Sequence, residues 1–262
     1  MELNLVNSVA GLFVGIVVGM TGVGGGSLMA PIMMLIFGIA PATAVGTDLW
    51  FAGITKIFGF SVHRKKGTID VGILRRMFYG SIPAAILTLV WLHESGGSQV
   101  KSGAMMKTLG VTLVLTSIAA LFRAQVHKVG AYVRGTRPVP FKAMQPALTV
   151  LAGAILGFLV TFTSIGSGAL GAVMLLYLYP RRLTPSSLVG TDITHAIPLT
   201  FLAGFGHLLM GNVDPGLLGN LLIGSIPGIL IGSYAAVHAP EKVIRTSIAI
   251  VLALVGLKML TT

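Results

Sequence analysis

The sequence predicts an all-α polytopic membrane protein made of two inverted-topology repeats, each with about five helical segments of which the first two form a Gly-broken hairpin. Three observations predict this fold: the composition, an internal repetition and the placement of basic residues. Hydrophobic residues make up 54% of the 262-residue chain and charged residues only 10%, and the mean hydropathy is +0.92. Soluble chains carry roughly 25% charged residues, so this chain has too little polar surface to face water.

The expected helices follow from the apolar runs along the chain. They fall at 6–20, 28–39, 43–62, 71–92 and 103–122, and again at 146–163, 169–179, 187–209, 215–237 and 241–260. The second and seventh runs are short, because a bilayer crossing takes roughly 20 apolar residues. Each short run follows a Gly/Ser-rich break, which predicts a hairpin that enters the membrane part-way. The sequence leaves open whether these hairpins are re-entrant or fully spanning.

The two halves of the chain repeat one another. The motif VGTD at Val45–Asp48 returns at Val189–Asp192, 144 residues later, and GSIP at Gly80–Pro83 returns at the same offset. The Gly-rich run Gly22–Ser27 aligns with Ser164–Ala169 at an offset of 142. Fixed-period self-similarity is typical of duplicated structural units.

This repetition predicts a first membrane repeat over 1–133, a cytoplasmic linker over 134–145 and a second membrane repeat over 146–262. Lys and Arg gather in the expected loops at 63–66, 123–142 and 180–182. Cytoplasmic loops are enriched in these residues, so the two repeats are expected to have opposite orientations. Both termini are then non-cytoplasmic.

The two Gly/Ser-rich breaks predict an anion site. Broken helices of inverted repeats bind substrates in secondary transporters, and a helix N-terminus offers free N–H groups to an anion. The alternative is that small residues only allow close helix packing. The candidate substrate-binding residues at the breaks are Thr21, Gly22, Gly24, Gly25, Gly26, Ser27, Thr163, Ser164, Gly166, Ser167 and Gly168.

Charged residues inside apolar runs are costly and usually face a cavity or a partner. Lys56 is a candidate for binding the anion, and its alternative is snorkelling toward the basic residues at 63–66. Asp48, Asp192 and His195 are candidates for a proton relay, since His195 lies one helical turn after Asp192. Their alternatives are helix capping for the two acids and packing for the histidine.

A second group of polar residues is expected to be structural. His63 and His207 lie near the ends of helical runs, where they can cap carbonyl groups. Asp70 and Asp214 directly precede helical runs and predict N-caps.

Several functions are disfavoured by what the sequence lacks. The chain contains no Cys, and neither a Gly-x-Ser-x-Gly motif nor a His-Glu-x-x-His motif occurs. We therefore expect neither an enzyme, nor a metal, nor a cofactor. The net charge of +11 fits the membrane topology better than nucleic-acid binding. The expected partners are membrane lipid and a small anion, and a homo-oligomer remains open.

The order GMTGVGGGSLMAPIMMLIFGIAPATAVGTD at 19–48, with a weaker copy at 160–192, resembles the TauE/SafE family of sulfite and organosulfonate exporters. The resemblance covers nearly the whole chain. It implies a permease of the bacterial inner membrane that moves sulfite or an organosulfonate outward, with proton coupling as an open question. An anion channel on the same scaffold, an intramembrane enzyme and a membrane-resident assembly partner are the alternatives.

Overall fold

The computed structural model describes residues 4–21, 26–65, 69–95, 102–136, 138–235 and 241–261, and the secondary structure of these ranges is entirely helical. The helices follow the order of the predicted apolar runs, with one addition. They are α1 (Leu5–Thr21), α2 (Gly26–Leu35), α3 (Pro41–Lys65), α4 (Val71–Glu94), α5 (Ser102–Leu121), α6 (Arg123–Thr136), α7 (Pro138–Thr163), α8 (Ala169–Leu178), α9 (Pro185–Leu209), α10 (Pro215–Ala235) and α11 (Glu241–Thr261).

The helices have the lengths and surfaces of membrane spans. In the described ranges, 6 helical stretches are long and apolar enough to cross a membrane, and they include α4, α5, α7, α9, α10 and α11. Their outward faces are apolar, as shown by Leu87, Leu230 and Leu254, which are each more than 60% exposed. The predicted short runs are short helices, since α2 and α8 have 10 residues each. The protein is therefore an integral membrane protein.

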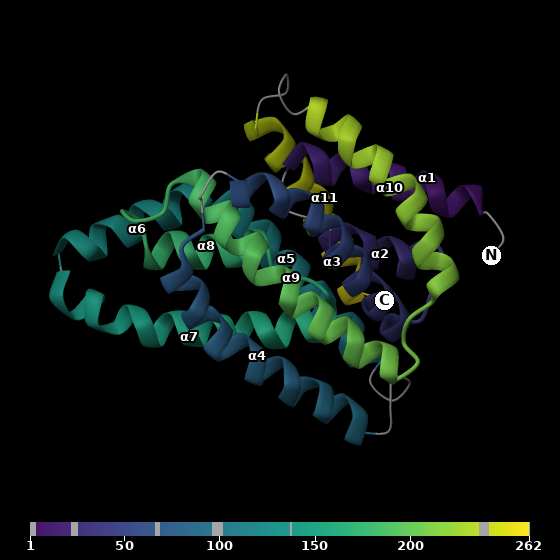
Figure 1. The fold of residues 1–262 in the computed structure, drawn as a ribbon, viewed down its shortest axis with the longest axis horizontal. Helices are drawn as coiled ribbons and strands as arrows, with labels where there is room; N and C mark the ends of the chain where they lie inside the picture. The colour runs from purple at the N-terminus through teal and green to yellow at the C-terminus, as the bar shows by residue number, and fades with distance from the viewer. Residues whose placement is uncertain are drawn as a thin grey trace.

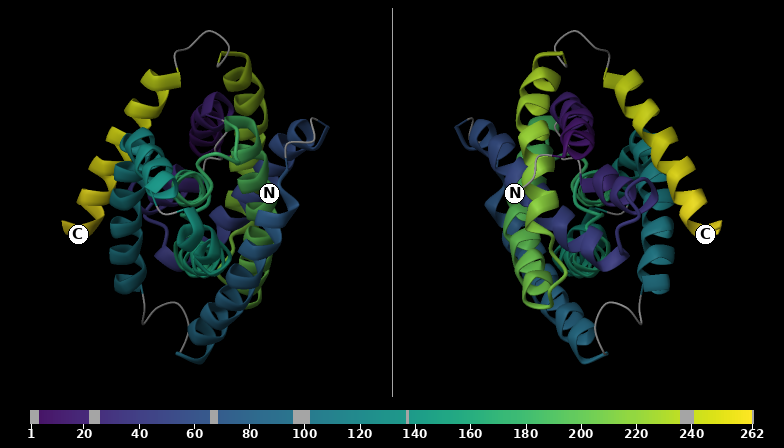
Figure 2. Two further views of the ribbon diagram at one scale, coloured as in Figure 1. Left: turned by 90° about the vertical axis from the view of Figure 1, so that its left-hand side faces the viewer. Right: turned by 90° about the vertical axis from the view of Figure 1, so that its right-hand side faces the viewer.

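The helices pack mainly in pairs that join the two halves of the chain. The most extensive contacts are those of α1 with α10, α4 with α7, α5 with α11 and α3 with α9. The pair of α5 and α11 stands on one side of the molecule and α4 and α10 stand on the other, with the short helices between them (Figure 2). Helix α6 lies at one end of the molecule, and the start of α1 lies at the opposite end (Figure 1).

Glycines bring two of these pairs into close contact. In the α1–α10 pair, a Cβ added to Gly224 would overlap the carbonyl oxygen of Ser8. In the α4–α7 pair, a Cβ added to Gly80 would overlap the carbonyl oxygen of Val150. Small residues allow this approach because membrane helices associate through packing rather than through exclusion of water.

The predicted N-caps are confirmed. The carboxylate of Asp70 accepts a hydrogen bond from the Ile73 N–H at 3.1 Å, and the carboxylate of Asp214 accepts one from the Leu217 N–H at 2.9 Å. These bonds satisfy N–H groups that the first helical turn leaves free.

Helix α9 is capped by a different residue from the acid that the sequence suggested. The Thr184 hydroxyl accepts from the Ser187 N–H in a capping box. Asp192 lies two turns further along α9 and is buried. The capping alternative for Asp192 is therefore wrong, because Thr184 precedes the helix and already fills that position.

The basic segment expected as a loop at 123–142 is largely helical. It forms α6 and the first residues of α7, and α6 packs against α8. Gly130 faces the Tyr177 carbonyl, and the His127 Nε2–H donates to the Pro180 carbonyl at 2.8 Å. The segment lacks a long apolar run because α6 is amphipathic and basic, so a search for apolar runs passes over it.

His207 has the structural role that the sequence predicted. It is fully buried, and its Nε2–H donates to the Thr161 carbonyl near the end of α7 at 3.0 Å. The side chain of His63 lies outside the described part of the structure.

Candidate functional site

The break between α7 and α8 has the backbone of a binding loop. Helix α7 ends at Thr163 and α8 begins at Ala169. Three of the residues between them have positive φ angles: Ser164 at 60°, Gly166 at 132° and Gly168 at 105°. The left-handed region is rare for a serine, and strained backbone of this kind gathers at binding sites. The loop therefore turns the chain without forming a helix inside the apolar core.

Hydroxyl groups in this loop have different partners. The Thr163 hydroxyl donates to the Leu159 carbonyl at 2.6 Å and accepts from the Ile165 N–H at 3.2 Å. The Ser164 hydroxyl is buried and has no hydrogen-bond partner among the described residues. Thr163 is thus used by the fold, whereas the Ser164 hydroxyl forms no hydrogen bond of regular geometry with a described residue.

The break between α1 and α2 is only partly described. Helix α1 ends at Thr21 and α2 begins at Gly26. The candidates Gly22, Gly24 and Gly25 lie outside the described residues, as do the side chains of Thr21 and Ser27. Their role at the site stays a prediction.

Lys56 lies at the centre of the candidate site. Its side chain is 5% exposed, and its Nζ donates a hydrogen bond to the Ser167 hydroxyl at 2.7 Å. This bond joins α3 to the α7–α8 break across the two halves of the chain. The ammonium group therefore points into the protein, and the snorkelling alternative is wrong.

Two buried carboxylates interact electrostatically with Lys56. They belong to Asp48 on α3 and Asp192 on α9, and both residues are less than 5% exposed. Opposite charges attract more strongly inside a protein than in water, because the effective dielectric constant is lower. Lys56 thus brings into one cluster two acids that lie 144 residues apart in the sequence.

These carboxylates retain free hydrogen-bonding capacity. Both oxygens of Asp48 and the Oδ1 of Asp192 are buried without a hydrogen-bond partner in the described part of the chain. The Ser164 hydroxyl interacts with the Asp48 carboxylate, and the Gly168 N–H interacts with the Asp192 carboxylate. Buried polar groups are normally paired, so this cluster has the features of a site that receives a ligand or a proton.

Gly171 shows how tightly the second carboxylate is enclosed. A Cβ at this position of α8 would lie 2.5 Å from the Oδ1 of Asp192. Any larger residue would therefore displace the carboxylate from the break. The first turn of α8 can contact α9 at this point because Gly171 has no side chain.

His195 has a partner that the sequence did not indicate. Its Nε2 and the Ser81 hydroxyl of α4 are 2.8 Å apart, and its ring lies 5.2 Å from that of Phe78. Its Nδ1 has no partner among the described residues. His195 is therefore held by α4 rather than by Asp192. Ser81 belongs to the repeated motif GSIP, and this repetition was the only feature of the sequence that pointed to Ser81.

Residues 8–259 match the protein family described as Sulfite exporter TauE/SafE. The chain belongs to the TauE/SafE family. Three relatives of this TauE/SafE protein are named as probable membrane transporter proteins. YjnA of Bacillus subtilis is 39% identical over 95% of this chain and 97% of its own length. YdhB of the same organism is 28% identical over 94% of this chain and 96% of its own length.

The third relative is MJ0441 of Methanocaldococcus jannaschii, 29% identical over 79% of this chain and 72% of its own length. No solved structure matches. The family and its relatives confirm that the sequence resemblance was correct and that the TauE/SafE chain is a membrane transporter.

Proposed function

We propose that the protein is a secondary transporter that exports a small sulfur oxyanion, sulfite or an organosulfonate, across the bacterial inner membrane. The observation that carries the proposal is the buried Lys56 ammonium, which is bonded to Ser167 at the helix break before α8. A buried cation at a Gly/Ser-rich break provides charge and donors for an anion that has left water.

The substrate would bind between Lys56 and the α7–α8 break. The Ser164 hydroxyl has no partner in the described residues, and Ser167 already contacts the cation. The oxyanion would share the ammonium with Ser167 and accept N–H groups from the first turn of α8, where the helix dipole favours negative charge. Gly22–Ser27 are proposed to complete the site from the other half.

We propose an inverted-repeat architecture, and reciprocal contacts support it. The Thr191 hydroxyl accepts from the Asp70 N–H at 3.0 Å, and the Thr47 hydroxyl accepts from the Asp214 N–H at 3.1 Å. Each residue of the second bond is 144 positions from its counterpart in the first. A two-fold relation between the halves produces such exchanged pairs, because each half then makes the same contact with the other.

The close glycine contacts have the same reciprocity. Gly224 faces Ser8, and its counterpart Gly80 faces Val150, which corresponds to Ser8 at the upstream offset of 142. The basic residues at 63–66, 123–142 and 180–182 are proposed to face the cytoplasm. Both termini then lie on the other side of the membrane, and 134–145 links the repeats on the cytoplasmic side.

Proton coupling is proposed from the charges of the site. With both carboxylates ionised, Lys56 balances only one of Asp48 and Asp192. An incoming anion would add a further negative charge in a medium of low dielectric constant, which is strongly unfavourable. A proton taken up by one carboxyl group would remove that penalty, and His195 is the nearest candidate along α9 for passing it on.

The experiment is sulfite flux in proteoliposomes, with thermal stability measured in the presence of sulfite, sulfate, thiosulfate and small sulfonates. We expect saturable sulfite flux whose rate changes with an imposed proton gradient, and a higher melting temperature with the substrate than with chloride. Lys56→Met should abolish both effects. Lys128→Met is the matched control, because Lys128 is exposed on α6.

Other outcomes separate the alternatives. Fast, non-saturating flux that never runs uphill would indicate an anion channel. A melting temperature that no anion changes, together with no flux, would leave an assembly role. Unchanged sulfite transport in Lys56→Met would refute the proposed site, and Asp192→Asn should remove the dependence on the proton gradient while substrate binding persists.

A further inference from the structure

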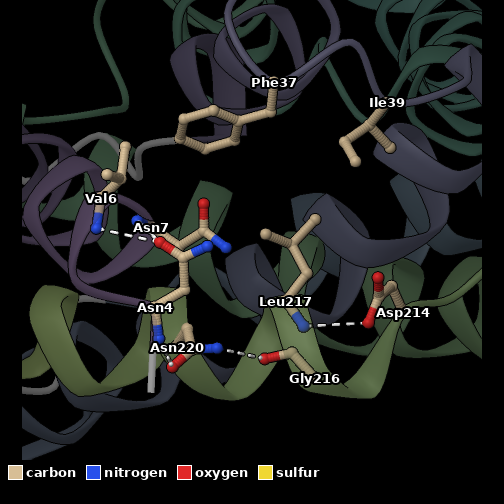
Figure 3. A pocket seen from close by; sticks show the side chains of 9 residues that line it. All are labelled: Asn4, Val6, Asn7, Phe37, Ile39, Asp214, Gly216, Leu217 and Asn220. Carbon is tan, nitrogen blue, oxygen red and sulfur yellow. Dashed lines mark hydrogen bonds between the residues drawn. The ribbon is translucent and has the colours of Figure 1, made fainter. Parts of the chain in front are cut away.

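The molecule has an open cleft at one end and a bonded cluster at the equivalent place on the other end. The cleft has a volume of about 600 Å³ and lies between the starts of α1 and α10 and the segment after α2. Its lining includes Asn7, Phe37, Ile39, Asp214, Leu217 and Asn220. Phe37 and Ile39 lie across the open space from Leu217 (Figure 3).

The residues at the repeat-related positions are hydrogen-bonded to one another. Phe37 corresponds to Tyr179 and Asn7 to Thr149 at the offset of 142, and Asn220 corresponds to Arg76 at the offset of 144. In the structure the Tyr179 hydroxyl lies 2.7 Å from the Thr149 hydroxyl and accepts from Arg76 Nη1 at 3.1 Å. Tyr179 is 3% exposed.

An ion pair lies beside this closed end, but its Arg182 side chain is 51% exposed, and exposed pairs contribute little to stability. Arg182 donates to both carboxylate oxygens of Asp70, at 2.6 and 2.8 Å, and its guanidinium lies 5.8 Å from the centre of the Tyr179 ring. Asp214, the counterpart of Asp70, has no ion pair in the described part of the structure. We call Tyr179, Thr149, Arg76, Arg182 and Asp70 the Tyr179 cluster.

We propose that the cleft and the Tyr179 cluster are the open and closed forms of one pair of gates, and that opening of the cluster is coupled to closure of Phe37 over Leu217. The inference rests on the inverted repeat proposed above. If the halves are related by a two-fold axis, the opposite state of the transporter is obtained by exchanging their conformations. Tyr179 would then leave Thr149 and Arg76, while Phe37 would approach Asn7 and Asn220.

The chemistry of the two ends explains which state is observed. The closed end is held by hydrogen bonds to charged groups, which are stronger than bonds between neutral groups. Phe37 lacks the hydroxyl of Tyr179 and can close the cleft only by apolar contact. The equilibrium therefore favours the state with the Tyr179 cluster formed.

Thiol labelling tests the coupling, since the chain contains no native Cys. Leu217→Cys reports on the cleft, which Leu217 lines while being only 6% exposed. Its counterpart Ile73→Cys reports on the closed end, where Ile73 is 0% exposed. Each reporter is placed in the parent chain and in a Tyr179→Phe/Arg182→Ala background. Removing these contacts should raise the ratio of the opposite state to the observed state by about a hundredfold. A ratio near 1:99 would then become a mixture of comparable populations.

The expected result is a large rise in the labelling rate of Ile73→Cys together with a fall of about half in that of Leu217→Cys. Arg75→Ala is the control, because Arg75 is exposed and its guanidinium lies 5.9 Å from the Tyr79 ring, outside the cluster. A rise at Ile73→Cys without the fall at Leu217→Cys would mean local loosening and would overturn the proposal. Unchanged labelling at both reporters would overturn it too.

The labelling requires no substrate, so it separates this inference from the proposed function. Reciprocal labelling without sulfite flux would leave the gates in place and remove the substrate assignment. Sulfite flux without reciprocal labelling would support the substrate assignment and overturn the proposed gates. A second reporter pair, Leu148→Cys and Val6→Cys, repeats the test if Ile73→Cys lowers the melting temperature.

Discussion

The buried charge cluster makes a quantitative prediction about stability. Lys56→Met replaces the ammonium by an unbranched apolar side chain and leaves Asp48 and Asp192, both less than 5% exposed, without their cation. Lys56 interacts with both acids without a direct ion pair in the described part of the structure, so its removal should cost less than the loss of about 3–5 kcal/mol that follows from breaking a direct buried pair. In a chain of this length about 1 kcal/mol corresponds to roughly 2–4 °C, so the melting temperature should fall by less than about 20 °C.

A triple variant shows whether this loss has an electrostatic cause. Lys56→Met combined with Asp48→Asn and Asp192→Asn removes all three charges, and it should recover most of the lost stability. Anion binding should remain absent, because the cation is still missing. Intrinsic fluorescence of Trp50 and Trp91 can follow unfolding in detergent, with Lys128→Met expected within about 0.5 kcal/mol of the parent.

A Lys56→Met protein with the same melting temperature as the parent protein would refute this prediction. The ammonium would then not be compensating the charge of either carboxylate. Equal instability of the single and triple variants would also contradict it, since the loss would come from packing around the Lys56 stem.

Three further predictions concern single substitutions at close contacts, strained backbone and helix caps. Gly80→Ala should destabilise the protein by about 1–3 kcal/mol, because the added Cβ would overlap the Val150 carbonyl and push α4 away from α7. Gly103→Ala is the control, because a Cβ there meets nothing within 4 Å. It should leave thermal unfolding unchanged. Gly168→Ala should cost about 1–3 kcal/mol and lower sulfite flux, because its φ is 105° and a residue with a Cβ is strained there. Thr184→Ala should lower the free energy of unfolding by about 1 kcal/mol through loss of the α9 capping box.

The sequence predicted the features of this protein that depend on nearby residues. The caps at Asp70 and Asp214 and the short helices after the two breaks follow from local pattern, because a cap or a break is decided within a few positions. Helix α6 was missed since its residues alternate basic and apolar character around the helix rather than forming an apolar run.

The contacts of the site could not be predicted in this way. Lys56 could have turned toward water or toward the core, and only its distance of 2.7 Å from Ser167 shows which. Tyr179, Thr149 and Arg76 come from three separate segments, so no spacing along the chain relates them. A hydrogen bond between distant segments depends on packing that local patterns do not specify.

The candidate site is asymmetric although the sequence of the two halves repeats. Each half supplies one aspartate, Asp48 or Asp192, yet only the first half has a lysine at this position, since the counterpart of Lys56 is Thr200. One ammonium can serve both acids because it interacts with both. Its hydrogen bond, however, goes to Ser167, where the first half has Gly25. The cation therefore favours one break over the other, which supports a substrate position displaced toward the start of α8.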